Sequence, residues 1–435
     1  QVKILHDICT SETVKDKYIC ISTTVKDVIT NSTHQDITAA VTHQSIVATT
    51  ARDRIIAAGL AEIIHIIAQI ARHRVIALVA LHHVVVDEYR RRKPAASLDA
   101  AERAFGAWAA TTPSKRQAAL LRLADAIEAN ADEIVEAQCR NTGQPKAIVR
   151  AEEAIAGANQ LRFFAGAARM VHGLSAGEYL EGFTSYVRRE PIGVVGQVAP
   201  WNFPFLMAIW KIGPALATGN TVVLKPSDTT PESTLVLARL SKGILPDGVL
   251  NVILGTGETG AALVEHPVPG LVSITGSVRA GIAVAESAAK QLKRSHLELG
   301  GKAPVVVFPD VDIAKAAAGI AEGGCFNAGQ DCTAATRVIV HESIHDEFVT
   351  ALAAAAQNLR PGLPDDPDAF YGPMNNVNHF NTVIKKLQGL PPHATVVTGG
   401  KQWGDKGFFI EPTIISGVHQ DDAIVQEETF APVIT

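Results

Sequence analysis

Two short glycine-flanked segments carry side chains that together could perform covalent chemistry. The first is Glu298-Leu299-Gly300-Gly301-Lys302 and the second is Gly329-Gln330-Asp331-Cys332. A lone cysteine is more often a small buried hydrophobe than a nucleophile. A thiol and a general base together, however, are the minimum for acyl chemistry that passes through a covalent intermediate and ends in hydrolysis. The pair Cys332 and Glu298 therefore predicts an active site, and the glycines leave room for a substrate.

Further candidates follow two predicted strands, where open α/β sheets bind their ligands. Pro200-Trp201-Asn202-Phe203-Pro204 follows the first strand, and Lys225-Pro226-Ser227-Asp228 follows the second. An acid at this place in a dinucleotide fold accepts hydrogen bonds from a ribose diol, and Lys225 can donate to the same sugar. Asp228 would also repel a 2′-phosphate, which favours NAD over NADP. The alternative is that Ser227 or Asp228 caps a helix.

The segment Gly255–Gly260 matches the dinucleotide fingerprint G-x-G-x-x-G between a strand and a helix. The acid expected at the end of the following strand is missing from Ser273–Ser277. We therefore interpret the segment as a tight strand-to-helix turn and keep Gly257 as a candidate cofactor contact. Gly276 and Ser277 open the next helix and could place backbone N–H groups on a phosphate.

Helices and short apolar runs would position these side chains. Residues 98–138 have apolar positions at helical spacing, Asn141–Gly143 predicts a turn, and further helix is expected to about His172. From Ile192 onward, apolar runs alternate with helical patterns, which predicts βαβ units and a parallel sheet buried on both faces. The predicted strands are Ile192–Ala199, Thr221–Lys225, Val249–Leu254, Val272–Thr275, His296–Leu299 and Pro304–Phe308.

The composition is typical of a soluble globular protein, with 47% hydrophobic and 19% charged residues. A net charge of -5 and scattered basic residues give no reason to expect nucleic acid as a partner. The most apolar stretch, Ile55–Val86, is interrupted by charged residues and histidines, so no membrane span is predicted. Five cysteines without a CxxC pair favour a reducing cytoplasm over a disulfide framework or a structural zinc site.

The first 93 residues differ in composition from the rest. They contain one glycine, no proline and no phenylalanine, although turns usually need glycine or proline. An unrelated extension, a fusion or a frame-shifted stretch would each explain this. Seven histidines lie there, but no carboxylate or thiol stands at ligand spacing, so no metal site is predicted. We expect residues 1–93 to be an unassigned segment, 94–298 an NAD-binding domain and 299–435 a catalytic domain.

At the residues just described, the stretch from about Ser97 to Thr435 resembles the aldehyde dehydrogenase superfamily. Six motifs in the expected order are far more specific than any one alone. They are Pro200–Pro204, Lys225–Asp228, Ile274–Gly281, Leu297–Lys302, Phe326–Cys332 and Glu427–Pro432. The resemblance implies an α/β fold with a Rossmann-type cofactor domain and a second α/β catalytic domain with parallel sheets. Within the family, three segments look like the aminobutyraldehyde dehydrogenases: Asn327–Ala335, Lys225–Thr230 and Val272–Arg279.

The resemblance also implies a mechanism. Cys332 attacks an aldehyde carbon, and the side-chain amide of Asn202 and the backbone N–H of Cys332 hold the oxyanion. Hydride transfer to NAD then leaves a thioester, which a water activated by Glu298 hydrolyses. A glutamate at this position favours hydrolysis over acyl transfer to coenzyme A, because family members that use coenzyme A usually lack it.

Further roles follow from the same resemblance. The implied cofactor contacts are Trp201, Lys225, Ser227, Asp228, Gly257, Gly276, Ser277, Leu299, Glu428 and Phe430. An ω-amino aldehyde such as 4-aminobutanal carries a cation, so its tunnel should offer aromatic faces or carboxylates. The substrate candidates are Phe203, Met207, Trp210, Asp331 and Glu153, with Glu152 also considered and a solvated helix face as the alternative for both glutamates.

Departures from the family pattern leave alternative functions open. Ala431 stands where the family commonly has glycine, and its methyl group could shift Phe430. The family normally continues beyond the Glu427–Thr435 motif, so we expect the catalytic domain to be truncated at its C-terminus. A homodimer or homotetramer is expected if the family assembly is retained. The alternatives are a betaine aldehyde or general aliphatic aldehyde dehydrogenase, and a catalytically incompetent relative that serves a structural or binding role.

Overall fold

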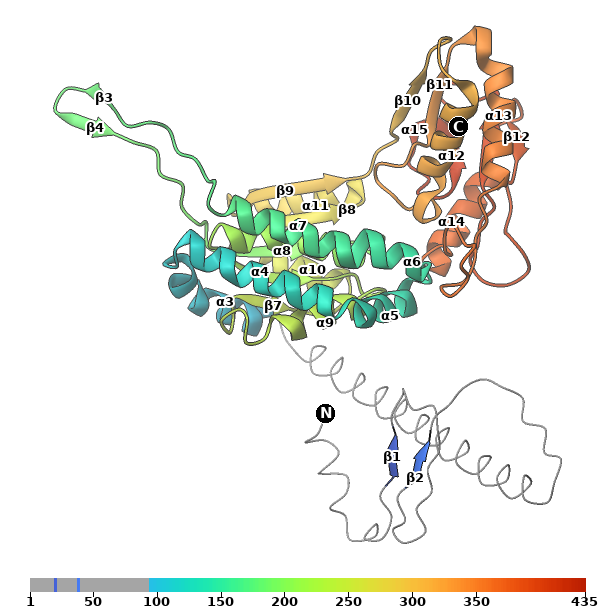
Figure 1. The fold of residues 1–435 in the computed structure, drawn as a ribbon. Coiled ribbons are helices and arrows are strands. Elements are labelled where there is room, and N and C mark those ends of the chain that lie inside the picture. Colours follow the sequence, from blue (N-terminus) through green and yellow to red (C-terminus); the bar gives the residue numbers. More distant parts are fainter. Residues whose placement is uncertain (1–18, 22–36, 40–93) are drawn as a thin grey trace. The chain divides into compact units, whose positions relative to one another are not determined.

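The computed structural model describes residues 19–21, 37–39 and 94–435, and Figure 1 shows these elements. The chain divides into two units, Gln1–Val85 and Val86–Thr435. In the first unit, β1 (Ile19–Ile21) pairs in parallel with β2 (Ile37–Ala39). The rest of the N-terminal segment, with its seven histidines, lies outside the described residues. All further elements belong to the second unit.

Three helices open the second unit: α3 (Pro94–Ala109), α4 (Pro113–Ala129) and α5 (Ala131–Thr142). The side chain of Thr112 caps α4 by accepting from the N–H of Lys115, and Pro113 occupies the first helical position. Leu120, Leu123, Ala124 and Ile127 are fully buried, as their helical spacing predicts. The predicted turn is confirmed, because α5 ends at Thr142 and Gly143 caps it with a left-handed φ of 72°.

The next helical region differs from the prediction. It consists of α6 (Lys146–Ile148), a π-helical turn η1 (Val149–Ile155) and α7 (Ala156–Ala167). The helix therefore stops before His172, because Met170 and Val171 have no core to pack against and are exposed. A β-hairpin of β3 (Gly177–Leu180) and β4 (Phe183–Ser185) follows, which the sequence pattern did not predict. Figure 1 shows it extending away from the helices.

A five-stranded parallel sheet, in the order β7-β6-β5-β8-β9, follows the hairpin. Its strands are β5 (Val194–Val198), β6 (Thr221–Lys225), β7 (Leu250–Val252), β8 (Pro269–Gly276) and β9 (Arg294–Leu299). The crossover helices are α8 (Pro204–Ala217), α9 (Glu232–Ser241), α10 (Gly257–Glu265) and α11 (Val278–Ala289). The predicted βαβ alternation is confirmed.

At β5 and β6 both faces of this sheet are buried, as the continuous apolar runs predict, whereas the edge strand β9 is largely exposed. Along β6, Val222 and Leu224 join the core formed by α4, α5, α7 and α8, whereas Val223 joins a second core with Leu98 of α3 and Leu263 of α10. Alternate residues of a strand point to opposite faces, so one short run serves two helical layers.

The remaining residues pack around a separate core that draws on residues 305–434. In it, β10 (Pro304–Val307) pairs in parallel with β11 (Arg337–Val340). A three-stranded sheet contains β12 (Thr395–Thr398), β13 (Thr413–Ser416) and β14 (Val433–Ile434). The pair β12–β13 is antiparallel and β13–β14 is parallel, so this sheet is mixed rather than parallel.

Helices complete this part of the chain. They are α12 (Ile313–Cys325), η2 (Phe326–Gly329), η3 (Glu342–Ile344), α13 (His345–Gln357), α14 (Val377–Gln388) and α15 (Ala423–Gln426). Among the residues that the structure describes, no helix is both long enough and apolar enough to cross a membrane.

Candidate active site

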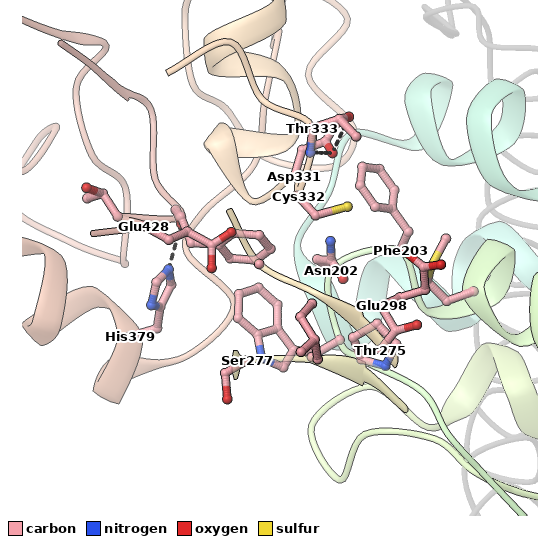
Figure 2. A pocket seen from close by; sticks show the side chains of 18 of the residues that line it. Asn202, Phe203, Thr275, Ser277, Glu298, Asp331, Cys332, Thr333, His379 and Glu428 are labelled. Atoms are coloured by element: carbon pink, nitrogen blue, oxygen red, sulfur yellow. Dashed lines mark hydrogen bonds between the residues drawn. The ribbon is translucent and has the colours of Figure 1, made fainter. Parts of the chain in front are cut away.

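A cavity of about 520 Å³ lies at the carboxyl ends of β5, β8 and β9 (Figure 2). It collects side chains that are up to about 280 residues apart in sequence, from Glu152 to Phe430. Carboxyl ends of parallel strands are where such sheets bind ligands. The predicted site residues on its lining are Trp201, Asn202, Phe203, Met207, Trp210, Gly276, Ser277, Glu298, Leu299, Asp331, Cys332, Glu428 and Phe430.

The nucleophile candidate sits after a strained loop. Helix α12 ends at Cys325, and Asn327, Ala328 and Gly329 then adopt left-handed φ angles of 51°, 58° and 65°. A Cβ atom on Gly329 would lie 2.1 Å from the carbonyl oxygen of Ala431, so only glycine fits there. The loop turns the chain back so that the exposed thiol of Cys332 reaches the cavity.

Partial burial raises the pKa of the Cys332 thiol, and the carboxylate of Asp331 raises it further. The Asp331 Oδ1 atom also accepts hydrogen bonds from the N–H and the hydroxyl of Thr333, at 2.8 and 2.9 Å. The thiol therefore holds its proton more strongly than a free cysteine does, and it must lose the proton to act as a nucleophile.

Asn202 lies just before α8 and is buried. Its amide nitrogen donates to the carbonyl oxygen of Gln330 at 3.1 Å. A side-chain amide has two N–H donors, so the second remains for a ligand oxygen. Figure 2 shows this nitrogen on the side of the amide that faces Cys332. A free N–H group beside the thiol could donate to an oxygen that develops negative charge there.

Glu298 projects from β9 into the same cavity and begins a line of polar groups. His296 Nε2 lies 3.3 Å from Glu298 Oε1, and His296 Nδ1 lies 3.3 Å from the hydroxyl of Ser273. The ammonium of Lys211 donates to Ser273 Oγ at 3.0 Å, and burial lowers the pKa of Lys211 to about 7. Residues His296 and Glu298 share a face because they are two apart on one strand. A second cavity of about 590 Å³ borders this line.

The Glu427–Pro432 motif forms the opposite wall. Glu428 Oε1 accepts from the N–H of Gly301 at 3.3 Å, and burial raises the pKa of Glu428. Phe430 has a left-handed φ of 55°, and its carbonyl oxygen accepts from His379 Nε2 at 2.7 Å. The ring of Trp201 packs edge-on against Phe430, with centroids 5.4 Å apart. The motif thus presents a carboxylate and an aromatic wall to the cavity.

The donors expected for a dinucleotide lie at neighbouring strand ends. Ser277 caps α11 by accepting from the N–H of Ala280, which leaves the other first-turn N–H groups for an anion. Burial lowers the pKa of Lys225, whose ammonium donates to the carbonyl oxygen of Pro226 at 3.0 Å. A Cβ atom on Gly257 would meet no atom within 4 Å, so the space above it is open. This donor set fits a dinucleotide, although Lys225, Ser227, Asp228 and Gly257 lie off the cavity lining.

The structure does not bring Glu153 to the cavity, contrary to the sequence-based expectation. Its side chain is 1% exposed, and its Oε2 atom accepts from the N–H groups of Phe205 and Leu206 at 3.0 and 3.2 Å. Burial raises the pKa of Glu153 to about 8. Glu152 is exposed and lines the cavity instead, because adjacent residues of a helical turn point in different directions.

Sequence reasoning missed several residues that support the site. His379 and Lys386 of α14 hold the Glu427–Phe430 segment, with Lys386 donating to Glu427 Oε2 and to the Glu428 carbonyl oxygen, both at 3.0 Å. The side-chain nitrogens of Gln144 and Asn327 both donate hydrogen bonds to the carbonyl oxygen of Asn202. Asn327 lies within a recognised motif, whereas Gln144, His379 and Lys386 are distant in sequence and carry no local signal.

One group outside the cavity combines metal-ligand residue types: His393, His419 and Asp422. His393 Nε2 lies 2.8 Å from Asp422 Oδ2, and the two imidazole rings stack with centroids 4.0 Å apart at 12°. An ion bound by two imidazoles lies close to the plane of each ring. Two nearly parallel rings stacked face to face do not share such a point, so the observed geometry is that of a stacked, hydrogen-bonded pair.

Comparison with known proteins identifies the family. The model of the aldehyde dehydrogenase family matches residues 84–435. Aldehyde dehydrogenase 1 of Tanacetum cinerariifolium is 42% identical over 355 residues, which cover 80% of this chain and 71% of that protein. The aldehyde dehydrogenase of Emericella nidulans is 43% identical over 342 residues, covering 77% and 68%.

Solved structures agree with this result and confirm the predicted fold. A putative aldehyde dehydrogenase from Burkholderia cenocepacia superposes with a TM-score of 0.75 at 41% identity. The NAD⁺ complex of aldehyde dehydrogenase from Bacillus cereus gives 0.76 at 36%, and a gamma-glutamyl-gamma-aminobutyraldehyde dehydrogenase from B. cenocepacia J2315 gives 0.76 at 38%. Each covers 78% of this chain and 70% of the other. This chain therefore belongs to the aldehyde dehydrogenase family.

Proposed function

We propose that this chain oxidises an aldehyde to the carboxylic acid through a thioester on Cys332, with NAD as the oxidant. The observation that carries the proposal is that Cys332, Asn202 and Glu298 line one cavity beside the dinucleotide-type strand ends. The overall reaction consumes an aldehyde, NAD⁺ and water, and it yields the acid, NADH and a proton.

Acylation begins when Cys332 Sγ attacks the carbonyl carbon. The S–C bond forms, the carbonyl π electrons move to oxygen, and the thiol proton passes to a base, for which Glu298 is available in the cavity. The free N–H of Asn202 and the backbone N–H of Cys332 would hold the oxyanion. Removing one such donor costs about 2.7–4 kcal/mol of transition-state stabilisation in comparable sites.

Bound NAD would supply the hydride acceptor, and loss of hydride from the substrate carbon would restore its C=O bond and leave a thioester on Cys332. Phe430 and Trp201 would border the nicotinamide ring, and Glu428 would hold its ribose. Glu298 would first release the thiol proton to solvent. It would then take a proton from water while the water oxygen attacks the thioester carbon, the C–S bond breaks, and the departing Cys332 thiolate regains that proton. Lys225 and Asp228 suit an adenine ribose with a free 2′-hydroxyl, because the carboxylate would repel a 2′-phosphate.

We propose an ω-amino aldehyde such as 4-aminobutanal as the substrate. Phe203, Met207 and Trp210 line the cavity, and the carboxylates of Asp331 and Glu152 lie on the same lining. Aromatic faces and carboxylates both attract an ammonium group. A general aliphatic aldehyde or betaine aldehyde is the second candidate, because the Tanacetum and Emericella relatives have names that specify no amino aldehyde.

The experiment measures NADH production with 4-aminobutanal, butanal, betaine aldehyde and acetaldehyde, for the wild type and Cys332→Ala. NADH production that is lost in Cys332→Ala supports the proposal. No NADH production by the wild type with any of the aldehydes overturns it. Asp331→Asn and Glu152→Gln should each lower kcat/KM for 4-aminobutanal relative to butanal. Unchanged ratios in both variants would reject the amino aldehyde and favour the general aldehyde.

We further propose that the chain forms a homodimer or homotetramer and is located in the cytoplasm. The resemblance to the family suggests the assembly, and the odd number of cysteines without CxxC spacing favours a reducing compartment. Light scattering of the purified chain tests the assembly.

A further inference from the structure

A buried chain of amide side chains joins the oxyanion donor to the loop that carries the nucleophile. Gln144 Nε2 donates to the carbonyl oxygen of Asn202 at 3.0 Å and to Asn327 Oδ1 at 2.7 Å. Asn327 Nδ2 donates to the same Asn202 oxygen at 2.9 Å and to the carbonyl oxygen of Gln330 at 3.2 Å. Because all four residues are buried, solvent does not readily replace these bonds.

The far side of Gln144 is anchored to the first turn of α8. Gln144 Oε1 accepts from Gln138 Nε2 at 2.9 Å, and the same nitrogen donates to Glu153. Glu153 in turn accepts from the N–H groups of Phe205 and Leu206. A carboxyl group at a helix N-terminus satisfies donors that have no partner within the helix. The chain of contacts therefore connects Asn202, just before α8, with the helix that follows it.

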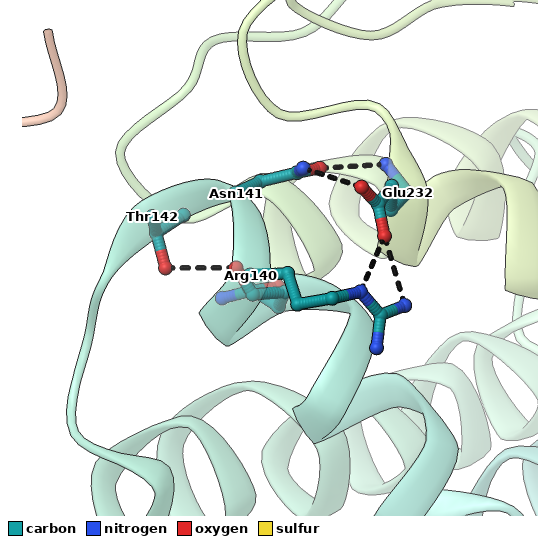
Figure 3. A network of polar contacts seen from close by, with 5 residues as sticks. Arg140, Asn141, Thr142 and Glu232 are labelled. Carbon is teal, nitrogen blue, oxygen red and sulfur yellow. Dashed lines mark hydrogen bonds and ion pairs between the residues drawn. The ribbon is translucent and has the colours of Figure 1, made fainter. Parts of the chain in front are cut away.

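The backbone that carries Gln144 is itself fixed, as Figure 3 shows for the end of α5. Asn141 donates to Glu232 Oε1 at 2.8 Å and accepts from the N–H of Glu232 at 3.0 Å. Arg140 pairs with the same carboxylate, at 2.8 Å between Arg140 Nη2 and Glu232 Oε2. A Cβ atom on Gly143 would lie 2.6 Å from Pro373, so the turn packs tightly against the catalytic part of the chain.

The loop that Gln144 contacts needs this support. Asn327 and Ala328 both have left-handed φ angles, which non-glycine residues adopt only at a cost. The Gln330 carbonyl at the end of the loop accepts from Asn202 as well as from Asn327. Asn202 is therefore hydrogen-bonded to the strained loop, and Gln144 Nε2 donates to both of them.

We propose that Gln144 is a positioning residue that fixes the distance between the Asn202 amide and the Cys332 thiol. Gln144 does not line the cavity, so it acts through Asn202 and Asn327. The proposal rests on the proposed function, because it assigns Gln144 to the acylation step of that reaction. Positioning requires a hydrogen-bond donor at residue 144. A side chain of similar length without an N–H group should leave Asn202 and Asn327 without these bonds.

The test compares Gln144→Met, which removes both polar atoms, with Gln144→Lys. Lysine restores a donor that reaches the same two oxygens, and Glu153 balances its charge. Gln144→Met should lower kcat by about 10- to 100-fold, as expected for a reacting group misplaced by about 1 Å. The dissociation constant of NADH, measured by its fluorescence, should stay unchanged. Gln144→Lys should recover most of kcat, and Gln160→Met, an exposed site on α7, should match the wild type.

Amide hydrogen exchange gives a readout that does not depend on activity. Peptides covering residues 200–206 and 325–335 should exchange at least several-fold faster in Gln144→Met, and Gln144→Lys should restore protection. Equal kcat and equal exchange in Gln144→Met and the wild type would overturn the inference. An inactive wild type would instead reject the proposed function, while the exchange data would still decide whether Gln144 holds the two segments.

Discussion

Asp331 has two opposing effects, one on the thiol of Cys332 and one on the charge of the cavity. The Asp331 carboxylate raises the pKa of the neighbouring thiol, which disfavours the thiolate, yet it also supplies a negative charge to the substrate cavity. Both Thr333 donors bind one oxygen of Asp331, so the carboxyl group is held in place beside the thiol. If the substrate is the proposed amino aldehyde, Asp331 would attract its cation at the cost of a less readily ionised thiol.

Asp331→Asn should separate these effects. An amide keeps the oxygen that Thr333 uses but removes the charge, so the pKa of Cys332 falls and the thiolate fraction near neutral pH rises. Alkylation of Cys332 by iodoacetamide should become several-fold faster. Asp310→Asn, at an exposed position off the cavity, serves as the control and should leave the rate unchanged. A slower rate in Asp331→Asn would contradict the assigned cause of the raised pKa.

Asp228 offers a second test at the same scale. Replacing it with serine removes the charge that would repel a 2′-phosphate, so the ratio of kcat/KM for NADP to that for NAD should rise at least several-fold. Steady-state kinetics with both cofactors measures the ratio. An unchanged ratio would show that Asp228 does not select the cofactor and only accepts a hydrogen bond from the Ser227 hydroxyl, at 3.4 Å.

Among the elements, the loop η2 shows what sequence patterns do not contain. The sequence predicted β5, β6 and β9 because short apolar runs between turn and helix patterns are local properties of the sequence. The left-handed path through Asn327 depends on contacts with Gln144 and Ala431, which are far away in sequence. Motif resemblance therefore located the loop, but its geometry came only from tertiary structure.

The wrong prediction for Glu153 has a similar cause. Glu152 and Glu153 are adjacent in the π-helical turn η1, and composition does not say which of the two faces the α8 N-terminus. The hairpin β3–β4 was missed because its side chains are exposed, so it lacks the apolar alternation that marks a half-buried strand. Both errors concern elements whose orientation is decided by their neighbours.

Gly329→Ala tests the loop at the scale of the element. Its φ of 65° costs an alanine about 1–2 kcal/mol, and the added methyl group would meet the Ala431 carbonyl oxygen at 2.1 Å. We expect a lower free energy of unfolding and a loss of NADH production, since the loop must move. The matched change Gly166→Ala in α7 meets no atom within 4 Å and should stabilise by about 0.4–1 kcal/mol. Equal stability of the two variants in urea would contradict the strain argument.

In the described part of the second unit, the site residues come from two parts of the chain that pack around separate cores. Residues 98–297 pack around three cores and residues 305–434 around another, and the cavity lining takes side chains from both parts of the chain. Catalysis therefore depends on how these parts meet, and the buried amide chain with Glu153 at its end is a direct connection between them. The ionisation of Glu153 should consequently be visible in the stability of the whole molecule.

Burial raises the pKa of Glu153 to about 8 from its ordinary value of 4.5, so the folded state holds this proton more strongly than the unfolded chain. Between these two values the folded state binds more protons, and linkage then requires stability to fall as pH rises. The contribution is complete below 4.5 and is lost as pH rises through about 8. Urea unfolding across this range should show a steeper fall for the wild type than for Glu153→Gln, which cannot ionise. The difference between the two proteins isolates Glu153 from all other titrating groups. Parallel pH profiles would mean that the three donors to Glu153 already offset its burial, and that the carboxylate is charged at neutral pH.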